Sequence, residues 1–139
     1  MNDAIHINEL PLPAALVQAI RHGVWRTPKN REAWLSLFPD GRIVQPMLYP
    51  LEKLAGKTPW FTEAGPAYYG SRGDGIEPGD IDPCLAVLIG DLGPDRLIAL
   101  DYRPSLIEPT VVGLTSGGSC WRLIANNIGS FMRASELVD

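Results

Sequence analysis

The sequence predicts an α+β fold, with a twisted, mainly antiparallel sheet flanked by N-terminal helices and a C-terminal helix. Apolar residues recur at helical spacing near both ends of the chain. Between them, residues 84–125 contain four short aliphatic runs separated by turn residues, as expected for strands. The 139 residues show no internal repeat and no second core, so we expect one domain over 1–139.

The first helix is predicted over residues 13–22. Leu12, Leu16 and Ile20 recur at helical spacing, and Gly23 provides a stop. A second helix is expected to follow Thr27 and Pro28, which offer an N-cap and a proline at the first helical position.

The segment between the helices and the sheet has weaker signals. A short strand is predicted around 42–44 and a short helix around 51–55. Residues 56–83 contain proline and glycine at short intervals and predict a long ordered loop around a brief strand at 67–69. Loops of this length inside a compact domain are often functional.

The clearest strand signal is CLAVLIG at 84–90, which is apolar on both faces and typical of a central strand covered on both sides. The segment DLGPDR turns the chain, and LIALDYR at 97–103 returns it. Alternation places Asp101 and Arg103 on the same face of this second strand, where they can pair.

Two further strands and a helix complete the predicted domain. The strands are TVVGL at 110–114 and WRLIA at 121–125. Asn127 is expected to cap the last helix, whose inward face is formed by Ile128, Phe131 and Met132.

A family resemblance emerges from the order and spacing of several motifs. VLIGDLGPDRLIALDYRPS is followed by VVGL and WRLIANNIGSFM, and is preceded by LPAALVQAIRHGVWRTP and PAYYGSRG. This arrangement resembles the SUKH superfamily of bacterial immunity proteins, which is grouped with a yeast cell-wall synthesis regulator. The resemblance covers nearly the whole chain.

The resemblance implies a sheet flanked by helices, no catalytic centre, and a role in binding and neutralising a cognate toxin domain, commonly a nuclease or deaminase. The superfamily has no fixed catalytic or ligand residues, so the resemblance assigns none to this chain. A second reading stays open: a regulatory or scaffold protein of the yeast-regulator kind, which binds a peptide or protein partner without a toxin.

Composition and charge indicate which partners are disfavoured and in which compartment we expect the protein. A net charge of −4 disfavours nucleic acid, because its phosphates would be repelled. The chain has no apolar run of the roughly 20 residues that a membrane span needs, and its N-terminus does not resemble a signal peptide. We therefore expect a cytoplasmic protein that binds neither nucleic acid nor membrane.

The motif GGSCW at 117–121 raises the question of a catalytic thiol at Cys120. A thiol nucleophile needs a base, but the two histidines, His6 and His22, both precede it, unlike the downstream histidine of papain-like proteases. Cysteine and histidine spacings match no zinc site, and the acidic residues near Asp80 lack the order of a calcium loop. We therefore expect no enzyme activity, no metal and no cofactor.

The partner-binding surface is predicted from the distribution of acidic residues. Residues 74–101 contain seven acidic side chains and one basic side chain. Toxins that act on nucleic acid tend to carry basic clefts, so carboxylates on an inhibitor would steer their association. The turn at 91–95 is expected near the same end of the sheet as residues 74–82. The predicted toxin-facing surface has two tyrosine anchors and five carboxylates: Tyr68, Tyr69, Glu77, Asp80, Asp82, Asp91 and Asp95.

Overall fold

The computed structural model describes residues 5–7, 9–26, 31–37, 47–63, 81–92, 96–114 and 121–135. Its centre is a five-stranded sheet of order β3-β4-β5-β6-β7 in which every neighbouring pair is antiparallel. The strands are β3 (Met47–Leu48), β4 (Ala86–Asp91), β5 (Leu97–Asp101), β6 (Thr110–Leu114) and β7 (Trp121–Ala125). This confirms the α+β class and the antiparallel sheet.

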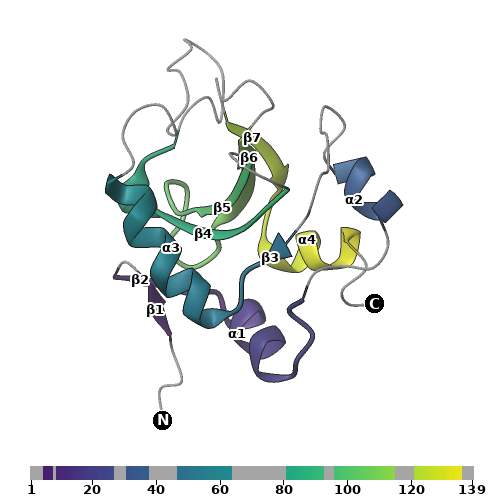
Figure 1. Cartoon of the computed structure of the whole chain (residues 1–139), viewed down its shortest axis with the longest axis horizontal. Helices are drawn as coiled ribbons and strands as arrows, with labels where there is room; N and C mark the ends of the chain where they lie inside the picture. Colours follow the sequence, from purple (N-terminus) through teal and green to yellow (C-terminus); the bar gives the residue numbers. More distant parts are fainter. Residues whose placement is uncertain are drawn as a thin grey trace.

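Helices surround the sheet on several sides (Figure 1). They are α1 (Ala14–Arg21), α2 (Arg31–Leu37), α3 (Leu51–Glu63) and α4 (Ile128–Ala134), with a 3₁₀ turn η2 (Pro83–Leu85) before β4. Helix α3 packs against β4, whereas α4 packs against β6 and β7 and contacts α1 and α2. A small hairpin of β1 (His6–Ile7) and β2 (Leu10–Pro11) precedes α1.

The three middle strands form the centre of the core. Their residues are buried on both faces along nearly the whole length of each strand. Val87 and Leu88 are consecutive in the regular part of the β4–β5 ladder, so they point to opposite faces, and both are fully buried. The prediction of a central strand covered on both sides is confirmed, although the first residues of the predicted strand form η2 instead.

Helix α3 corrects the prediction of a loop beginning at Gly56. The helix continues through Gly56 and Pro59 to Glu63. Leu54 and Thr58 are fully buried, and the Oγ1 of Thr58 accepts a hydrogen bond of 3.1 Å from the backbone N–H of Leu88. Packing on β4 therefore outweighs the low helix propensity of glycine and proline.

Strand β3 is a short edge strand that the sequence did not indicate, while the predicted strand at 42–44 lies outside the described residues. Leu48 pairs with Gly90, and the Tyr49 N–H donates to the carbonyl of Ile89 over 2.9 Å. A Cβ at Gly90 would collide with the backbone carbonyl of Met47. Glycine is needed here because two backbones approach closely beside an irregular register.

The helices at the two ends of the chain follow the prediction. Helix α1 is followed by Gly23 at a φ of +70°, in the left-handed region that glycine adopts readily. The Oδ1 of Asn127 accepts from the Ser130 N–H over 2.7 Å and caps α4. The inward residues of α4 are buried as expected, namely Ile128, Phe131 and Met132. The predicted cap of α2 at Thr27 and Pro28 lies outside the described residues.

Aromatic side chains connect the helical layer to the sheet. The ring of Phe131 lies 6.3 Å from that of Trp25 and 6.4 Å from that of Trp34, centroid to centroid. The Trp25 indole N–H donates to the Tyr49 carbonyl over 2.9 Å. In the part of the chain that the structure describes, no helix is both long and apolar enough to cross a membrane.

Candidate partner-binding surface

The sheet has two ends that carry different functional groups. At one end, Ala86 pairs with Asp101, Asp101 with Thr110, and Val111 with Ala125. This end includes Asp82 and is called the Asp82 end. At the other, Asp91 pairs with Leu97 and Leu114 with Trp121. It is called the Asp91 end.

The expectation that residues 74–82 and the turn at 91–95 lie near the same end of the sheet is wrong for the two of these carboxylates that are described. Asp82 precedes β4 and Asp91 is its last residue. At about 3.3 Å per residue, β4 alone separates them by roughly 17 Å. The other five members of the predicted surface lie outside the described residues: Tyr68, Tyr69, Glu77, Asp80 and Asp95.

Asp82 is fixed in place and still exposed. Its Oδ1 accepts a hydrogen bond of 2.9 Å from the Cys84 N–H and so caps η2. The preceding residue, Ile81, is buried in the core. Asp82 therefore presents a carboxylate at a defined position, because the backbone on both sides of it is held.

Asp91 has a structural role. It is half-buried, and it accepts a hydrogen bond of 2.6 Å from the hydroxyl of Tyr49. Burial, followed by this hydrogen bond and the nearby negative charge, raises the pKa of Tyr49 well above its usual value. The ammonium of Lys53 lies 5.7 Å from the centre of the same ring. Asp91 therefore ties β3 to β4, and its carboxylate is already engaged within the domain.

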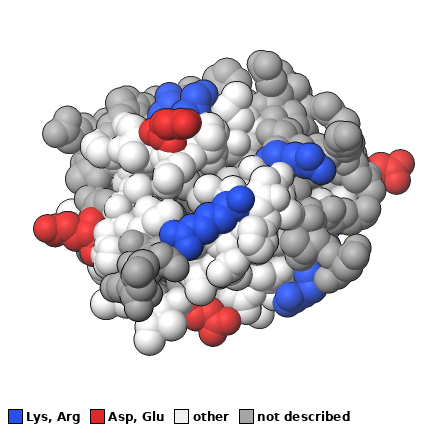
Figure 2. Space-filling view, turned by 90° about the horizontal axis from the view of Figure 1, so that it is seen from below, with Lys and Arg blue, Asp and Glu red and all other residues white. Residues whose placement is uncertain are grey.

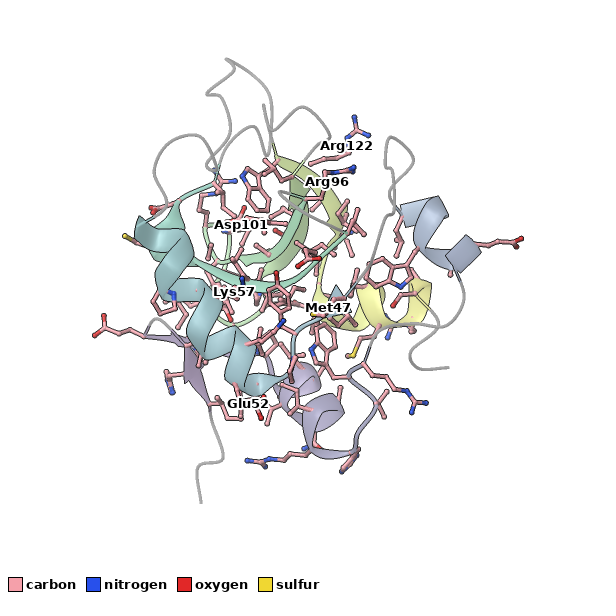
Figure 3. All side chains as sticks on the ribbon, viewed as in Figure 1. Met47, Glu52, Lys57, Arg96, Asp101 and Arg122 are labelled. Atoms are coloured by element: carbon pink, nitrogen blue, oxygen red, sulfur yellow. The ribbon has the colours of Figure 1, made fainter. Side chains whose placement is uncertain are left out.

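Asp101 and Arg103 form the ion pair that strand alternation predicted. The Arg103 Nε lies 3.0 and 3.1 Å from the two carboxylate oxygens of Asp101, and Nη2 lies 2.8 Å from Oδ2. Asp101 is only 2% exposed, whereas the Arg103 side chain is 29% exposed. The ion pair between Asp101, which is labelled in Figure 3, and Arg103 holds the chain in place where it leaves β5.

The connection between β5 and β6 contains an exposed apolar segment that the sequence reasoning missed. This segment, residues 104–109, is called the 104–109 loop. Leu106 is 54% exposed and Ile107 is 86% exposed. The Oγ of Ser105 accepts hydrogen bonds from the N–H groups of Ile107 and Glu108, at 3.1 and 3.0 Å. The two adjacent aliphatic residues between two prolines were the signal that could have found it.

Both signs of charge occur at the Asp82 end. Glu108 and the nearby Arg133 join Asp82 there, whereas the labelled residues Arg96 and Arg122 lie towards the Asp91 end (Figure 3). Figure 2 shows a face on which basic and acidic residues are interspersed rather than gathered by sign. Over the described ranges as a whole, basic and acidic side chains are nearly equal in number, so the acidic excess of the chain lies in residues outside them.

Reactive and metal-binding groups are sparse in the described part of the molecule. Cys84 is an exposed free thiol, and Cys120 lies outside the described residues. Among the residues that can be placed, no three His, Cys, Asp or Glu side chains come together as metal ligands. In comparisons with known proteins, no family model, curated protein or solved structure matched this chain.

Proposed function

We propose that this chain is a non-catalytic immunity protein of the SUKH type, which binds and neutralises a cognate bacterial toxin domain in the cytoplasm. The observation that carries the proposal is the position of Asp82. It is an exposed carboxylate held at the start of β4, where the acidic segment 74–82 joins the rigid sheet.

A fixed carboxylate suits an inhibitor of a basic enzyme. Its position is already set by the hydrogen bond to the Cys84 N–H, so little conformational freedom is lost when a partner binds. Acidic groups raise the association rate with a basic cleft and reject partners of the wrong charge.

The architecture also supports the proposal. An antiparallel sheet with helices before and after it, in the order that the structure has, is the arrangement that the SUKH resemblance implies. A shared scaffold limits the topology but leaves the partner to be decided by surface residues. The proposal therefore depends on the acidic surface, and the test is directed there.

The test pairs this chain with a toxin candidate. The C-terminal domain of a large secreted protein encoded by a neighbouring gene is expressed in a bacterial host, with and without this chain. We expect growth arrest by the toxin domain alone and restored growth on co-expression. The purified pair should associate more slowly as salt concentration rises.

Two variants locate the surface. Asp82→Lys should slow association and flatten its salt dependence. Glu52→Lys makes the same charge change at an exposed position of α3 and should have little effect. Failure of the wild-type chain to restore growth would count against an immunity role and favour the regulatory or scaffold reading. Restored growth with equal on-rates for both variants would show that Asp82 is not part of the toxin-binding surface.

A further inference from the structure

A surface pocket lies beside the 104–109 loop. It has a volume of about 400 Å³ and three walls: residues 13–15 at the start of α1, residues 107–109 of the loop, and the first turn of α4 with Arg133. Most of the lining is apolar, from prolines, alanines and isoleucines. Ile107 is part of this lining and is also the most exposed large apolar residue that the structure describes. An apolar protrusion and an apolar hollow are therefore adjacent.

Two opposite charges belong to the same pocket. Glu108 and Arg133 both line it, both are exposed, and they form no ion pair with each other. The guanidinium of Arg133 lies 3.4 Å from the Oγ of Ser130, which is a long contact to a neutral group. Each charge is therefore available to a group of opposite sign on another molecule.

We infer that two copies of this chain associate through the 104–109 loop and this pocket, related by a two-fold axis. In such an isologous contact each residue of one copy meets the corresponding surface of the other. Ile107 of each copy enters the pocket of its partner. Glu108 of each copy faces Arg133 of the other, so the two ion pairs form together.

Charge complementarity favours a second copy over a basic partner at this pocket. A purely basic surface would satisfy Glu108 but would be repelled by Arg133, whereas the second copy supplies both signs in reversed order. The hydrogen bonds that the N–H groups of Ile107 and Glu108 donate to the Oγ of Ser105 hold Ile107 in its exposed position, so the loop loses little freedom on association.

The contact is expected to be weak. One protruding side chain and one pocket per copy bury much less than the roughly 800 Å² per partner of a standard stable interface. Association should therefore appear only at high protein concentration. This inference concerns self-association alone and does not depend on the existence of a toxin partner.

Sedimentation equilibrium of the full chain from about 10 µM to about 1 mM, a range suited to weak contacts, tests the inference. We expect the average mass to rise from monomer towards dimer with concentration. Ile107→Asp should stay monomeric throughout. Leu123→Asp, the same change at an exposed aliphatic residue of β7, should associate like the wild type. Circular dichroism and thermal unfolding confirm that both variants are folded.

A charge exchange makes the test specific. Glu108→Arg and Arg133→Glu should each weaken association by at least tenfold, because each places like charges opposite one another. The double variant should recover most of the lost affinity, since it restores both pairs in reversed orientation. A wild-type chain that stays monomeric at 1 mM, equal association by Ile107→Asp, or a double variant as weak as the single ones would overturn the inference.

Discussion

The Asp82 end and the Asp91 end of the sheet are closed in different ways. At the Asp82 end, side chains that are at least partly exposed cap nearby backbone N–H groups: Asp82 caps Cys84, Ser105 caps Ile107 and Glu108, and Asn127 caps Ser130. A long-range contact at this end, from the Tyr102 hydroxyl to the Pro11 carbonyl, comes from a buried residue. At the Asp91 end, contacts join segments far apart in the chain, as in the hydrogen bond from Tyr49 to Asp91.

The two kinds of contact differ in how freely the residues around them can vary. Local caps need only a few neighbouring residues, so exposed side chains between them can change while the backbone stays in place. Long-range contacts couple a residue to the core, so a change there is transmitted to β3 and β4. A surface that must match different partners is better placed at the Asp82 end.

Gly90→Ala should have the largest effect, because the new Cβ would collide with the Met47 carbonyl and separate β3 from β4. We expect the free energy of unfolding to fall by about 3 kcal/mol, as for severe overpacking. Urea unfolding followed by tryptophan fluorescence measures it. The control is Gly56→Ala in α3, where a Cβ meets no atom within 4 Å and helix propensity favours a gain of about 0.5–1 kcal/mol. Equal effects of the two changes would contradict the close approach at Gly90.

Asp101→Ala should have the second-largest effect on stability. Asp101 is a buried residue at the Asp82 end, unlike the more exposed capping residues there. Asp101 is buried while Arg103 is partly exposed, so removing the carboxylate leaves a guanidinium that water can partly solvate. We expect a loss of about 2 kcal/mol, below the cost of breaking a fully buried pair. A double-mutant cycle with Arg103→Ala measures the coupling between the two side chains. Additive effects would show that the pair itself contributes nothing.

Alkaline pH should weaken both ends together. The pKa of Tyr49 is raised by burial and by its hydrogen bond to Asp91, and the pKa of Tyr102 is raised by burial. The unfolded chain ionises these tyrosines above about pH 10, while the folded chain keeps them neutral. Their contribution is therefore fully present below about pH 10 and falls above it, by up to about 1.4 kcal/mol per pH unit for each tyrosine.

Urea titrations between about pH 8 and about pH 11.5, around the ordinary tyrosine pKa, measure this slope. Tyr49→Phe and Tyr102→Phe should each flatten it, and the double variant should flatten it most. Tyr102→Phe also removes the 2.7 Å hydrogen bond from its hydroxyl to the Pro11 carbonyl, which joins the N-terminal hairpin to the sheet. An unchanged slope in the double variant would mean that other groups cause the alkaline loss.

Asp82→Ala should have the smallest effect on stability, about 0.5–1 kcal/mol, the typical cost of losing one cap. The Cys84 N–H should lose its side-chain partner and exchange with solvent faster, whereas the amides of β4 should keep their protection. Amide hydrogen exchange by NMR measures the Cys84 amide and the β4 amides separately. A loss of protection throughout β4 would show that this end is as strongly coupled to the core as the other.

The sequence predicted those parts of the fold that depend on local pattern. Strands β6 and β7 match the predicted 110–114 and 121–125, and the cap at Asn127 is present. The end of α3 was wrong because Gly56 and Pro59 are local breakers, while the contacts that stabilise the helix come from β4, about 30 residues away.

The candidate surface was predicted less well, for a similar reason. The acidic composition identified Asp82 and Asp91, but composition does not show which carboxylates the fold uses internally. Asp91 is engaged by Tyr49, 42 residues earlier, and β4 places it at the opposite end of the sheet from Asp82. The pair Asp101 and Arg103 was predicted from alternation along a strand that reaches Arg103, but β5 ends at Asp101. The pair forms just beyond the strand, where the Arg103 N–H also donates to the Oδ1 of Asp101.

The hydrogen bond between Thr58 and Leu88 has a consequence for how the chain avoids aggregation. Strand β3 ends before it reaches Leu88, so the amide there would otherwise be an open position on the edge of the sheet. Open edge amides are templates on which a strand from another molecule can add. Helix α3 closes this position with a hydroxyl group. Any condition that detaches α3 while the sheet persists would therefore expose β4 to intermolecular strand pairing, and a helix that belongs to no binding surface would determine how long the chain stays in solution.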